Sequence, residues 1–267
     1  MNQETSNNNR IVLVTGATGA IGKAIARQIA AKPGYSVTLL GRNENKAQKA
    51  TEEIKRATGN PHVNYEIADI SSRSAIYELA DRWHGRLHVL INNAAATPRR
   101  RQETADGIEL QFATNVLGYF WMTEAFSEIL KQSAPARVIN VVSYWAGDLD
   151  INDLEFERRR YNNGTAYRQS KQANRMLTVA FAERLQPFGV TVNACHPGDV
   201  NSTLSNDLGF GGHESPDEGA RTPVWLATSP TGGQETGKYF EHMRETRCSY
   251  AANRTAIEEL YAACQQY

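Results

Sequence analysis

The chain has 267 residues, of which 40% are hydrophobic and 22% are charged, and its formal net charge is zero. This composition is that of a globular protein, and the charge balance gives no overall field that would favour nucleic acid or an anionic membrane. One α/β domain of this length is ordinary, and no internal repeat or low-complexity linker divides the chain. We expect a polar, disordered tail over residues 1–9 and one domain over residues 10–267.

Cysteine usage and hydropathy predict a cytoplasmic location. Cys195, Cys248 and Cys264 are far apart and form no CxxC pair, so we expect neither a disulfide framework nor a metal site. The polar N-terminus lacks the apolar stretch of a signal peptide, and no apolar segment approaches the roughly 20 residues that span a bilayer. The expected partner is a small molecule, without nucleic acid or a membrane anchor. The arginine runs at 99–101 and 158–160 are expected in solvated loops.

Strands and helices are predicted to alternate along the chain. In the first half we expect a strand at 11–15, a helix at 21–31, a strand at 36–40, a helix at 43–57, a strand at 63–67, a helix at 74–83 and a strand at 87–91. In the second half we expect a long helix at 106–131, a strand at 137–142, a long helix at 165–185 and a strand at 190–194. An amphipathic segment at 253–262 would dock on the body or on a second subunit.

This alternation indicates βαβ units, which build a parallel sheet. The expected fold class is α/β, a single-domain Rossmann fold with a doubly wound parallel sheet of about seven strands and helices on both faces. Ligands of such sheets bind in the crevice beyond the carboxyl ends of the strands. The residues that follow each predicted strand are therefore the first candidates for a site.

A glycine-rich loop follows the first predicted strand. The segment TGATGAIG at 15–22 leads from that strand into a helix. Gly16 permits a tight turn, Gly19 lets the backbone approach a pyrophosphate, and Gly22 lets the helix pack close to the sheet. A glycine-rich loop between the first strand and a helix is typical of dinucleotide-binding proteins, so we expect a dinucleotide site here.

The residues after the second strand indicate which dinucleotide is bound. A carboxylate here would accept hydrogen bonds from a ribose 2′-hydroxyl and would repel a 2′-phosphate. The chain instead has Arg42 and Asn43 after Gly41, and a guanidinium suits a phosphate. We therefore expect NADP(H) in preference to NAD(H). The alternative is that Arg42 only caps a loop.

Four residues form the candidate catalytic group. Tyr167 and Lys171 are four positions apart on a predicted helix and so share one face. A phenol has a pKa near 10, and a nearby ammonium together with an oxidised nicotinamide would lower that pKa. Ser143 follows a strand, where its hydroxyl can hold a substrate oxygen. Asn115 lies inside a long helix, which is unfavourable unless its amide is used.

These motifs resemble the compact branch of the short-chain dehydrogenases/reductases over residues 11–261. The family pattern TGxxxGxG corresponds to TGATGAIG, NNAG to NNAA at 92–95, YxxxK to YRQSK at 167–171, and the Pro-Gly turn to Pro197 and Gly198. The segments ELQFATNVLG, AYRQSKQANRMLT, GVTVNACHPGDV and TGKYF are most similar to the retinol-dehydrogenase and WW-domain oxidoreductase-like group. Unlike the membrane-bound members of that group, the chain is expected to have no N-terminal anchor.

The resemblance implies a role for each matching residue. Tyr167 would be the general acid in reduction and the base in oxidation, and Lys171 would bind the nicotinamide ribose and lower the pKa of that tyrosine. Ser143 would polarise the substrate carbonyl, and Asn115 would hold a water that relays protons through Lys171. The expected cofactor contacts are Gly16, Thr18, Gly19, Ile21, Arg42, Asn43, Asp69, Ile70, Asn93, Ala94, Tyr167, Lys171, Val200 and Ser202. Since the family often forms dimers or tetramers, a homodimer or homotetramer is expected.

Two positions depart from the family pattern. Ala20 replaces the middle glycine of the loop and Gly19 comes one position earlier, a spacing more usual in the branch that processes nucleotide-sugars. Ala95 replaces the last glycine of NNAG and would narrow the approach of the backbone to the cofactor. Both changes concern the cofactor loops and leave the four catalytic candidates in place.

Other distinctive residues have simpler interpretations. His196 precedes the Pro-Gly turn and is expected to be structural. Trp121 fits a helical period and is expected in the core, whereas Trp145, two residues after Ser143, is a candidate wall of the substrate pocket. The stretch 201–216 is rich in glycine and predicts a mobile lid, with an ordinary surface loop as the alternative.

The sequence therefore predicts an NADP(H)-dependent oxidoreductase that interconverts a carbonyl and an alcohol on a small, rather apolar molecule, with Tyr167 as acid and base. One alternative is a cofactor-binding regulatory or interaction protein, which would not need the intact catalytic group. Another is a nucleotide-sugar epimerase or dehydratase, but the short C-terminal part leaves little room for the domain that binds the sugar nucleotide.

Overall fold

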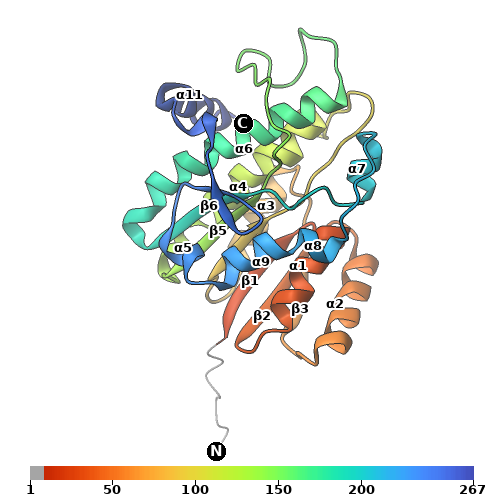
Figure 1. Ribbon diagram of the computed structural model, residues 1–267, viewed down its shortest axis with the longest axis vertical. Coiled ribbons are helices and arrows are strands. Elements are labelled where there is room, and N and C mark those ends of the chain that lie inside the picture. Colours follow the sequence, from red (N-terminus) through yellow and green to blue (C-terminus); the bar gives the residue numbers. More distant parts are fainter. Residues whose placement is uncertain (1–8) are drawn as a thin grey trace, which may run out of the picture.

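The computed structural model describes residues 9–267, which form an α/β fold around one eight-stranded sheet (Figure 1). The strands are β1 (Arg10–Thr15), β2 (Tyr35–Gly41), β3 (Val63–Ile67), β4 (Val89–Asn92), β5 (Ala136–Val141), β6 (Val190–Cys195), β7 (Tyr239–Glu241) and β8 (Arg244–Thr246). Their order in the sheet is β3-β2-β1-β4-β5-β6-β7-β8, and β1 to β7 are parallel.

Helices cover both faces of this sheet (Figure 1). The α-helices are α1 (Ala20–Ala30), α2 (Glu44–Thr58), α3 (Arg73–Asp81), α4 (Gly118–Ala125), α5 (Ser127–Gln132), α6 (Asn163–Leu185), α7 (Thr203–Asp207), α8 (Pro216–Gly219), α9 (Arg221–Thr228), α10 (Thr231–Gln234) and α11 (Arg254–Cys264). A π-helix, η1 (Phe112–Leu117), precedes α4, and two 3-10 turns are η2 (Gln186–Phe188) and η3 (Ser249–Ala251).

The central strands are buried on both faces, which explains their continuous apolar sequences. In β1, Leu13 packs into one apolar cluster, while its neighbours Val12 and Val14 pack into another, and all three are fully buried. The first cluster includes residues of α3, α4, α6 and α11, and the second includes residues of α1, α2 and α9. Successive strand residues therefore serve opposite faces, as the pleat requires.

The strand order confirms the expected fold class. The chain pairs β1 with β2 on one side and with β4 on the other, so the segments that follow β1 and β4 diverge and open a crevice. Most predicted elements match the observed ones to within a residue or two. The two short strands β7 and β8 were not located from the sequence. β8 is antiparallel to β7 and is joined to it through His242 and Met243, which have positive φ angles although their residue types give little turn signal.

The single long helix predicted at 106–131 was wrong. The chain instead forms η1, α4 and α5, and α4 and α5 are separated at Phe126 (φ −91°, ψ 2°). Helical structure starts late because the buried carboxylate of Glu109 accepts hydrogen bonds from the backbone amides of Gln111 (2.9 Å) and Phe112 (2.7 Å). A side chain that caps these amides sets the start of the helix.

The chain ends contribute differently to the fold. Residues 1–8 of the tail predicted at 1–9 lie outside the described residues. The prediction was wrong for Asn9, which donates a hydrogen bond to Oγ of Ser36 (3.1 Å) and so belongs to the folded part. At the other end, α11 docks on the body, where Tyr261 packs against Phe120 and Phe181 with ring centroids 5.1 and 5.4 Å apart.

Three further findings concern residues 9–267. None of the helices there combines the length and the apolar character needed to cross a membrane. The three cysteines are free. The same residues contain no group of three or more His, Cys, Asp or Glu side chains that could hold a metal ion.

Candidate active site

The glycine-rich loop turns sharply between β1 and α1. Gly16 has a φ of 63°, and a Cβ on it would lie 2.7 Å from the Cα of Ala94. A Cβ on Gly22 would lie 2.4 Å from the carbonyl oxygen of Gly16. The N-cap of α1 is Gly19, which has no side chain that could cap the helix, and the first turn has no acidic residue. The first amides of α1 are therefore uncapped by side chains, and this arrangement fits a bound pyrophosphate.

The loop lines a cleft of about 560 Å³ along the carboxyl ends of β1 to β4. Ten of the expected cofactor contacts line this cleft: Gly16, Thr18, Gly19, Ile21, Arg42, Asp69, Ile70, Asn93, Ala94 and Ser202. Thr15 joins the two sides of the crevice, because its Oγ1 accepts hydrogen bonds from the backbone amides of Asn93 (2.8 Å) and Ala94 (3.1 Å). Ala20 and Ala95, the two departures from the family pattern, also line the cleft.

Two cations beside β2 line this cleft. The side chain of Arg42 is 65% exposed, and its guanidinium lies 3.8 Å from the carboxylate of Asp69. An exposed ion pair of this length contributes little, so the guanidinium can still bind a phosphate. Lys46, one turn further along on α2, lines the cleft too, and the sequence interpretation missed it. Asn43, which was predicted to contact the cofactor, instead caps α2 by accepting a hydrogen bond from the amide of Lys46 (2.9 Å) and does not line the cleft.

Ser143, Tyr167 and Lys171 come together at the end of β5. Tyr167 and Lys171 lie one turn apart on α6 and are 7% and 3% exposed. The ammonium of Lys171 lies 5.5 Å from the centroid of the Tyr167 ring and donates a hydrogen bond to the carbonyl of Val141 (3.1 Å). Ser143 is also buried, and its Oγ accepts a hydrogen bond from the amide of Trp145 (3.0 Å). Lys171 does not line the cleft.

Burial sets the protonation of this group. It raises the pKa of Tyr167 to about 12, although the hydroxyl of Ser143 opposes the rise. Burial also lowers the pKa of Lys171 to about 7. The protein by itself therefore does not lower the pKa of the tyrosine, in contrast to what the nearby lysine led us to expect. A lowering by the oxidised nicotinamide stays a prediction.

Asn115 lies in the middle of the π-helix η1. Its Oδ1 accepts a hydrogen bond from the amide of Ala96 (2.8 Å), and its Nδ2 donates one to the carbonyl of Ala96 (3.0 Å). The backbone carbonyl of Asn115 accepts a hydrogen bond from Nδ2 of Asn174 on α6 (2.7 Å). The hydrogen bonds of a π-helix join residues five positions apart, and such turns are common at functional sites. Asn115 thus joins the segment after β4 to α6, and its role in holding a water stays a prediction.

Arg175 is a residue of the site that the sequence interpretation missed. It lies one turn beyond Lys171 on α6, is 7% exposed, and donates a hydrogen bond of 2.6 Å to the carbonyl of Ser143. Its guanidinium lies 3.7 Å from the centroid of the Tyr239 ring. The carbonyl and the ring together stabilise the buried charge. The available signal was its spacing, which puts it on the same helix face as Tyr167 and Lys171.

A second cavity, of about 460 Å³, adjoins the first, and Ile21, Ser202 and Leu204 line both. Ser143, Tyr167 and Val200 form part of its wall. Trp145 also lines it, as predicted, and meets the ring of Phe210 edge to face at 5.9 Å. Trp121 is 1% exposed and belongs to the core, which confirms its predicted position.

The predicted lid at 201–216 forms one side of the second cavity. Ser202 caps α7, and the amide of Asn201 donates a hydrogen bond to the carbonyl of Glu214 (2.9 Å). Gly212 has a φ of 73°, and a Cβ there would lie 2.5 Å from the backbone carbonyl of Val200. The segment therefore folds back on the end of β6 and contributes Phe210 to the cavity wall. Its opening and closing stay a prediction.

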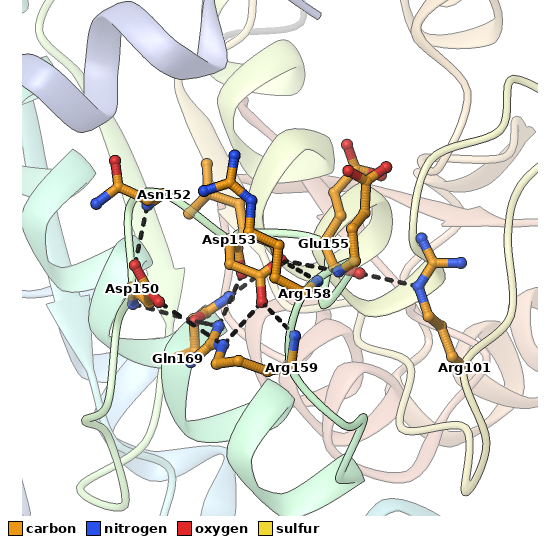
Figure 2. A network of polar contacts seen from close by, with 10 residues as sticks. Arg101, Asp150, Asn152, Asp153, Glu155, Arg158, Arg159 and Gln169 are labelled. Atoms are coloured by element: carbon orange, nitrogen blue, oxygen red, sulfur yellow. Dashed lines mark hydrogen bonds and ion pairs between the residues drawn. The ribbon is translucent and has the colours of Figure 1, made fainter.

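The two arginine runs were predicted in solvated loops, and this prediction is wrong for Arg101 and Arg159, which are partly buried. Figure 2 shows that Arg159 and Arg101 enter a polar network around the loop between β5 and α6. Arg159 pairs with the buried carboxylate of Asp153 (2.9 Å) and donates a hydrogen bond to Oε1 of Gln169 (2.9 Å) (Figure 2). Nε of Arg101 donates a hydrogen bond to a backbone carbonyl of the same loop (2.9 Å). Because Gln169 lies two residues beyond Tyr167, the network fixes this loop close to the site.

His196 is buried beside the second cavity, where its ring meets that of Tyr144 edge to face at 4.8 Å. Burial lowers the pKa of His196 to about 3, so the imidazole is neutral at physiological pH. Its backbone amide donates a hydrogen bond to the carbonyl of Phe240 (3.0 Å), which links β6 to β7. These contacts fit the structural role that was predicted.

Comparison with known proteins identifies the family. The model of the short chain dehydrogenase family matches residues 10–209. Retinol dehydrogenase 13 of Homo sapiens is 36% identical over 256 residues, covering 88% of this chain and 77% of that protein. Retinol dehydrogenase 12 of Homo sapiens is 36% identical over 272 residues, covering 96% and 85%. The solved structure of an uncharacterized protein from Mycobacterium Paratuberculosis is 28% identical, with a TM-score of 0.80 and coverage of 96% and 92%.

The chain therefore belongs to the short-chain dehydrogenase/reductase family, whose members are oxidoreductases that bind NAD(P). Within the family it is of the retinol-dehydrogenase-like group, which confirms the resemblance seen in the sequence.

Proposed function

We propose that the protein is an NADP(H)-dependent carbonyl reductase, or alcohol dehydrogenase in the reverse direction, that acts on a small molecule with an apolar body. The observation that carries this proposal is that Ser143 and Tyr167 line the second cavity, which adjoins the cleft of the glycine-rich loop, while the ammonium of Lys171 lies 5.5 Å from the Tyr167 ring. The larger cavity has the uncapped helix start that a pyrophosphate needs, and the smaller has aromatic walls suited to an apolar substrate.

When bound, the cofactor supplies the hydride in reduction and accepts it in oxidation. In reduction, the carbonyl carbon gains that hydride and the carbonyl oxygen gains the phenolic proton of Tyr167, so that an alcohol forms and the tyrosine becomes a phenolate. Oγ of Ser143 donates a hydrogen bond to the carbonyl oxygen as negative charge develops there. Tyr167 regains a proton from solvent by way of Lys171, with Asn115 holding a water of the relay. With a pKa raised to about 12, Tyr167 of the cofactor-free protein is protonated at neutral pH, as a general acid must be.

NADP(H) is the proposed cofactor because Arg42 and Lys46 both line the cleft beside β2. A 2′-phosphate would find two cations there, and a planar guanidinium can bind a phosphate through two parallel hydrogen bonds. A cytoplasmic location and a homodimer or homotetramer remain predictions.

Substitution of Tyr167 by phenylalanine tests the proposed function. We expect turnover of aldehydes and ketones by Tyr167→Phe to fall by roughly 10²–10⁴-fold, the usual contribution of general acid–base catalysis. NADPH affinity should change less than about twofold, because the ring and its packing are retained. Tyr65→Phe removes a phenol from β3, away from both cavities, and is the matched control. Near-normal activity of Tyr167→Phe would contradict the proposed mechanism, whereas tight NADPH binding by the wild type without turnover of any carbonyl would favour a cofactor-binding regulatory protein.

A further inference from the structure

The carboxylate of Asp199 lines the second cavity, with the phenol of Tyr144 as a hydrogen-bond donor to it but, among the described residues, without a cationic partner. It follows Gly198 (φ 105°) just beyond β6, and its side chain is half-buried. Its backbone carbonyl accepts hydrogen bonds from the amides of His213 (2.8 Å) and Glu214 (2.9 Å), which holds residue 199 in the cavity wall. Within residues 9–267, none of the ion pairs shorter than 4 Å includes Asp199. A carboxylate without a cationic partner in a cavity wall offers a charge-assisted hydrogen bond to a cationic ligand.

None of the cationic side chains around the site forms an ion pair with Asp199 within residues 9–267. Arg168 pairs with Asp148 at 2.6 Å. Arg175 is held by a backbone carbonyl and an aromatic ring and lines neither cavity. His213 lines the cavity with Asp199, but the two form no ion pair within 4 Å. A cation that neutralises Asp199 in this cavity would therefore come from the ligand.

The charge of Asp199 reaches the proposed general acid. Burial is the main cause of the raised pKa of both Tyr167 and Tyr144, and the negative charge of Asp199 adds to the rise for both phenols, with a hydrogen bond from Tyr144 to Asp199 as a further cause for Tyr144. The carboxylate therefore opposes the phenolate that Tyr167 becomes when it gives up its proton. A positive charge on the substrate, close to Asp199, would cancel that opposition during the reaction.

The rest of the cavity wall is also suited to an organic cation. Trp145 lies between Phe210 and Tyr167, with ring centroids 5.9 and 6.1 Å away, and aromatic faces attract ammonium groups. A hydrocarbon chain would use the aromatic rings but would leave the carboxylate without a cationic partner.

From these contacts we propose that Asp199 makes the cavity selective for substrates that carry a protonated amine a few bonds from the carbonyl, namely amino ketones, amino aldehydes and the corresponding amino alcohols. The inference rests on the proposed reductase function and narrows its substrate class. The reaction is unchanged: the carbonyl carbon gains the hydride from NADPH, the oxygen gains the proton of Tyr167, and the ammonium stays paired with Asp199 throughout.

The test compares two ketones of nearly equal shape. One is γ-(dimethylamino)butyrophenone, which is protonated at neutral pH, and the other is its carbon isostere, in which CH replaces the amine nitrogen. For the wild type, Asp199→Asn and the control Asp217→Asn, both kcat/KM with NADPH and the binding of each ketone to the NADP⁺ complex would be measured. Asp217 lies on α8, where it pairs with Arg27 outside the cavity, so the control makes the same charge change elsewhere. Asp199→Asn keeps the shape of the side chain and removes only its charge.

The wild type and Asp217→Asn should prefer the amine by at least about tenfold in kcat/KM and in affinity, since a desolvated charged hydrogen bond is worth that much. Asp199→Asn should lose this preference while it retains or improves turnover of the neutral ketone. Equal use of both ketones by the wild type would overturn the role of Asp199 and leave the reductase function standing. A change confined to NADP⁺ affinity in Asp199→Asn would likewise overturn it, because the carboxylate would then balance the cofactor. If neither ketone is reduced, the binding data still decide the role of Asp199, and the missing turnover counts against the reductase function.

Discussion

Substitution of Lys171 by methionine should make the protein without cofactor more stable, although it removes a proposed catalytic group. Burial lowers the pKa of Lys171 from 10.5 to about 7. Each pKa unit corresponds to about 1.4 kcal/mol, so keeping this lysine in the fold costs roughly 4–5 kcal/mol at and below pH 7. Methionine fills a similar volume without that cost.

Lost contacts offset part of this gain. The ammonium lies 5.3 Å from the Tyr119 ring and 5.5 Å from the Tyr167 ring, and it bonds the carbonyl of Val141. That carbonyl keeps a partner in the variant, because the hydroxyl of Tyr119 also donates to it (3.1 Å). With about 2 kcal/mol for the lost cation–π contacts and hydrogen bond, the net gain is on the order of 2–3 kcal/mol.

The pH dependence provides the sharper test. A lysine whose pKa is lower in the folded than in the unfolded state makes the unfolded state bind more protons between about pH 7 and 10.5, so the wild type gains stability as pH rises through this window. The advantage of Lys171→Met should therefore be largest at pH 7 and should shrink as pH rises. Urea unfolding followed by tryptophan fluorescence measures it, with exposed Lys32→Met as the control. A variant less stable than the wild type at pH 7, or an advantage that does not change with pH, would refute the reasoning.

Two further substitutions test the cofactor end and the support of the site. Arg42→Ala should weaken NADPH binding by roughly tenfold or more and NADH binding by less than about twofold, since a charged hydrogen bond contributes about 1.5–3 kcal/mol. Fluorescence titrations with both cofactors measure this, and equal losses of affinity would remove the basis for the NADP(H) assignment. Arg175→Met should lower kcat for carbonyl reduction by about tenfold while the Kd of NADPH stays within about twofold, because the carbonyl of Ser143 loses its donor. An unchanged kcat would show that Ser143 keeps its place without Arg175.

The sequence by itself determined the elements and motifs that depend on neighbours along the chain. Apolar runs and helical periods predicted the sheet and most helices, because strands buried on both faces and amphipathic helices each need their own local pattern. The glycine loop after β1 and the four-residue spacing of Tyr167 and Lys171 were visible for the same reason. The Rossmann topology then brought Ser143 to them, since the ends of parallel strands meet at one edge of the sheet.

Only the tertiary structure decided the features that depend on partners far apart in the chain. The carboxylate of Glu109 and the π-helix at Asn115 replaced a regular helix that the local pattern favoured. Arg175 donates a hydrogen bond to the carbonyl of Ser143, which is 32 positions away in the chain. Asp199 follows a different strand from Ser143 and lines the same cavity as Tyr167. The pKa values of Tyr167 and Lys171 likewise follow from how completely packing removes both groups from water, because burial acts through the whole surrounding structure and leaves no trace in local spacing.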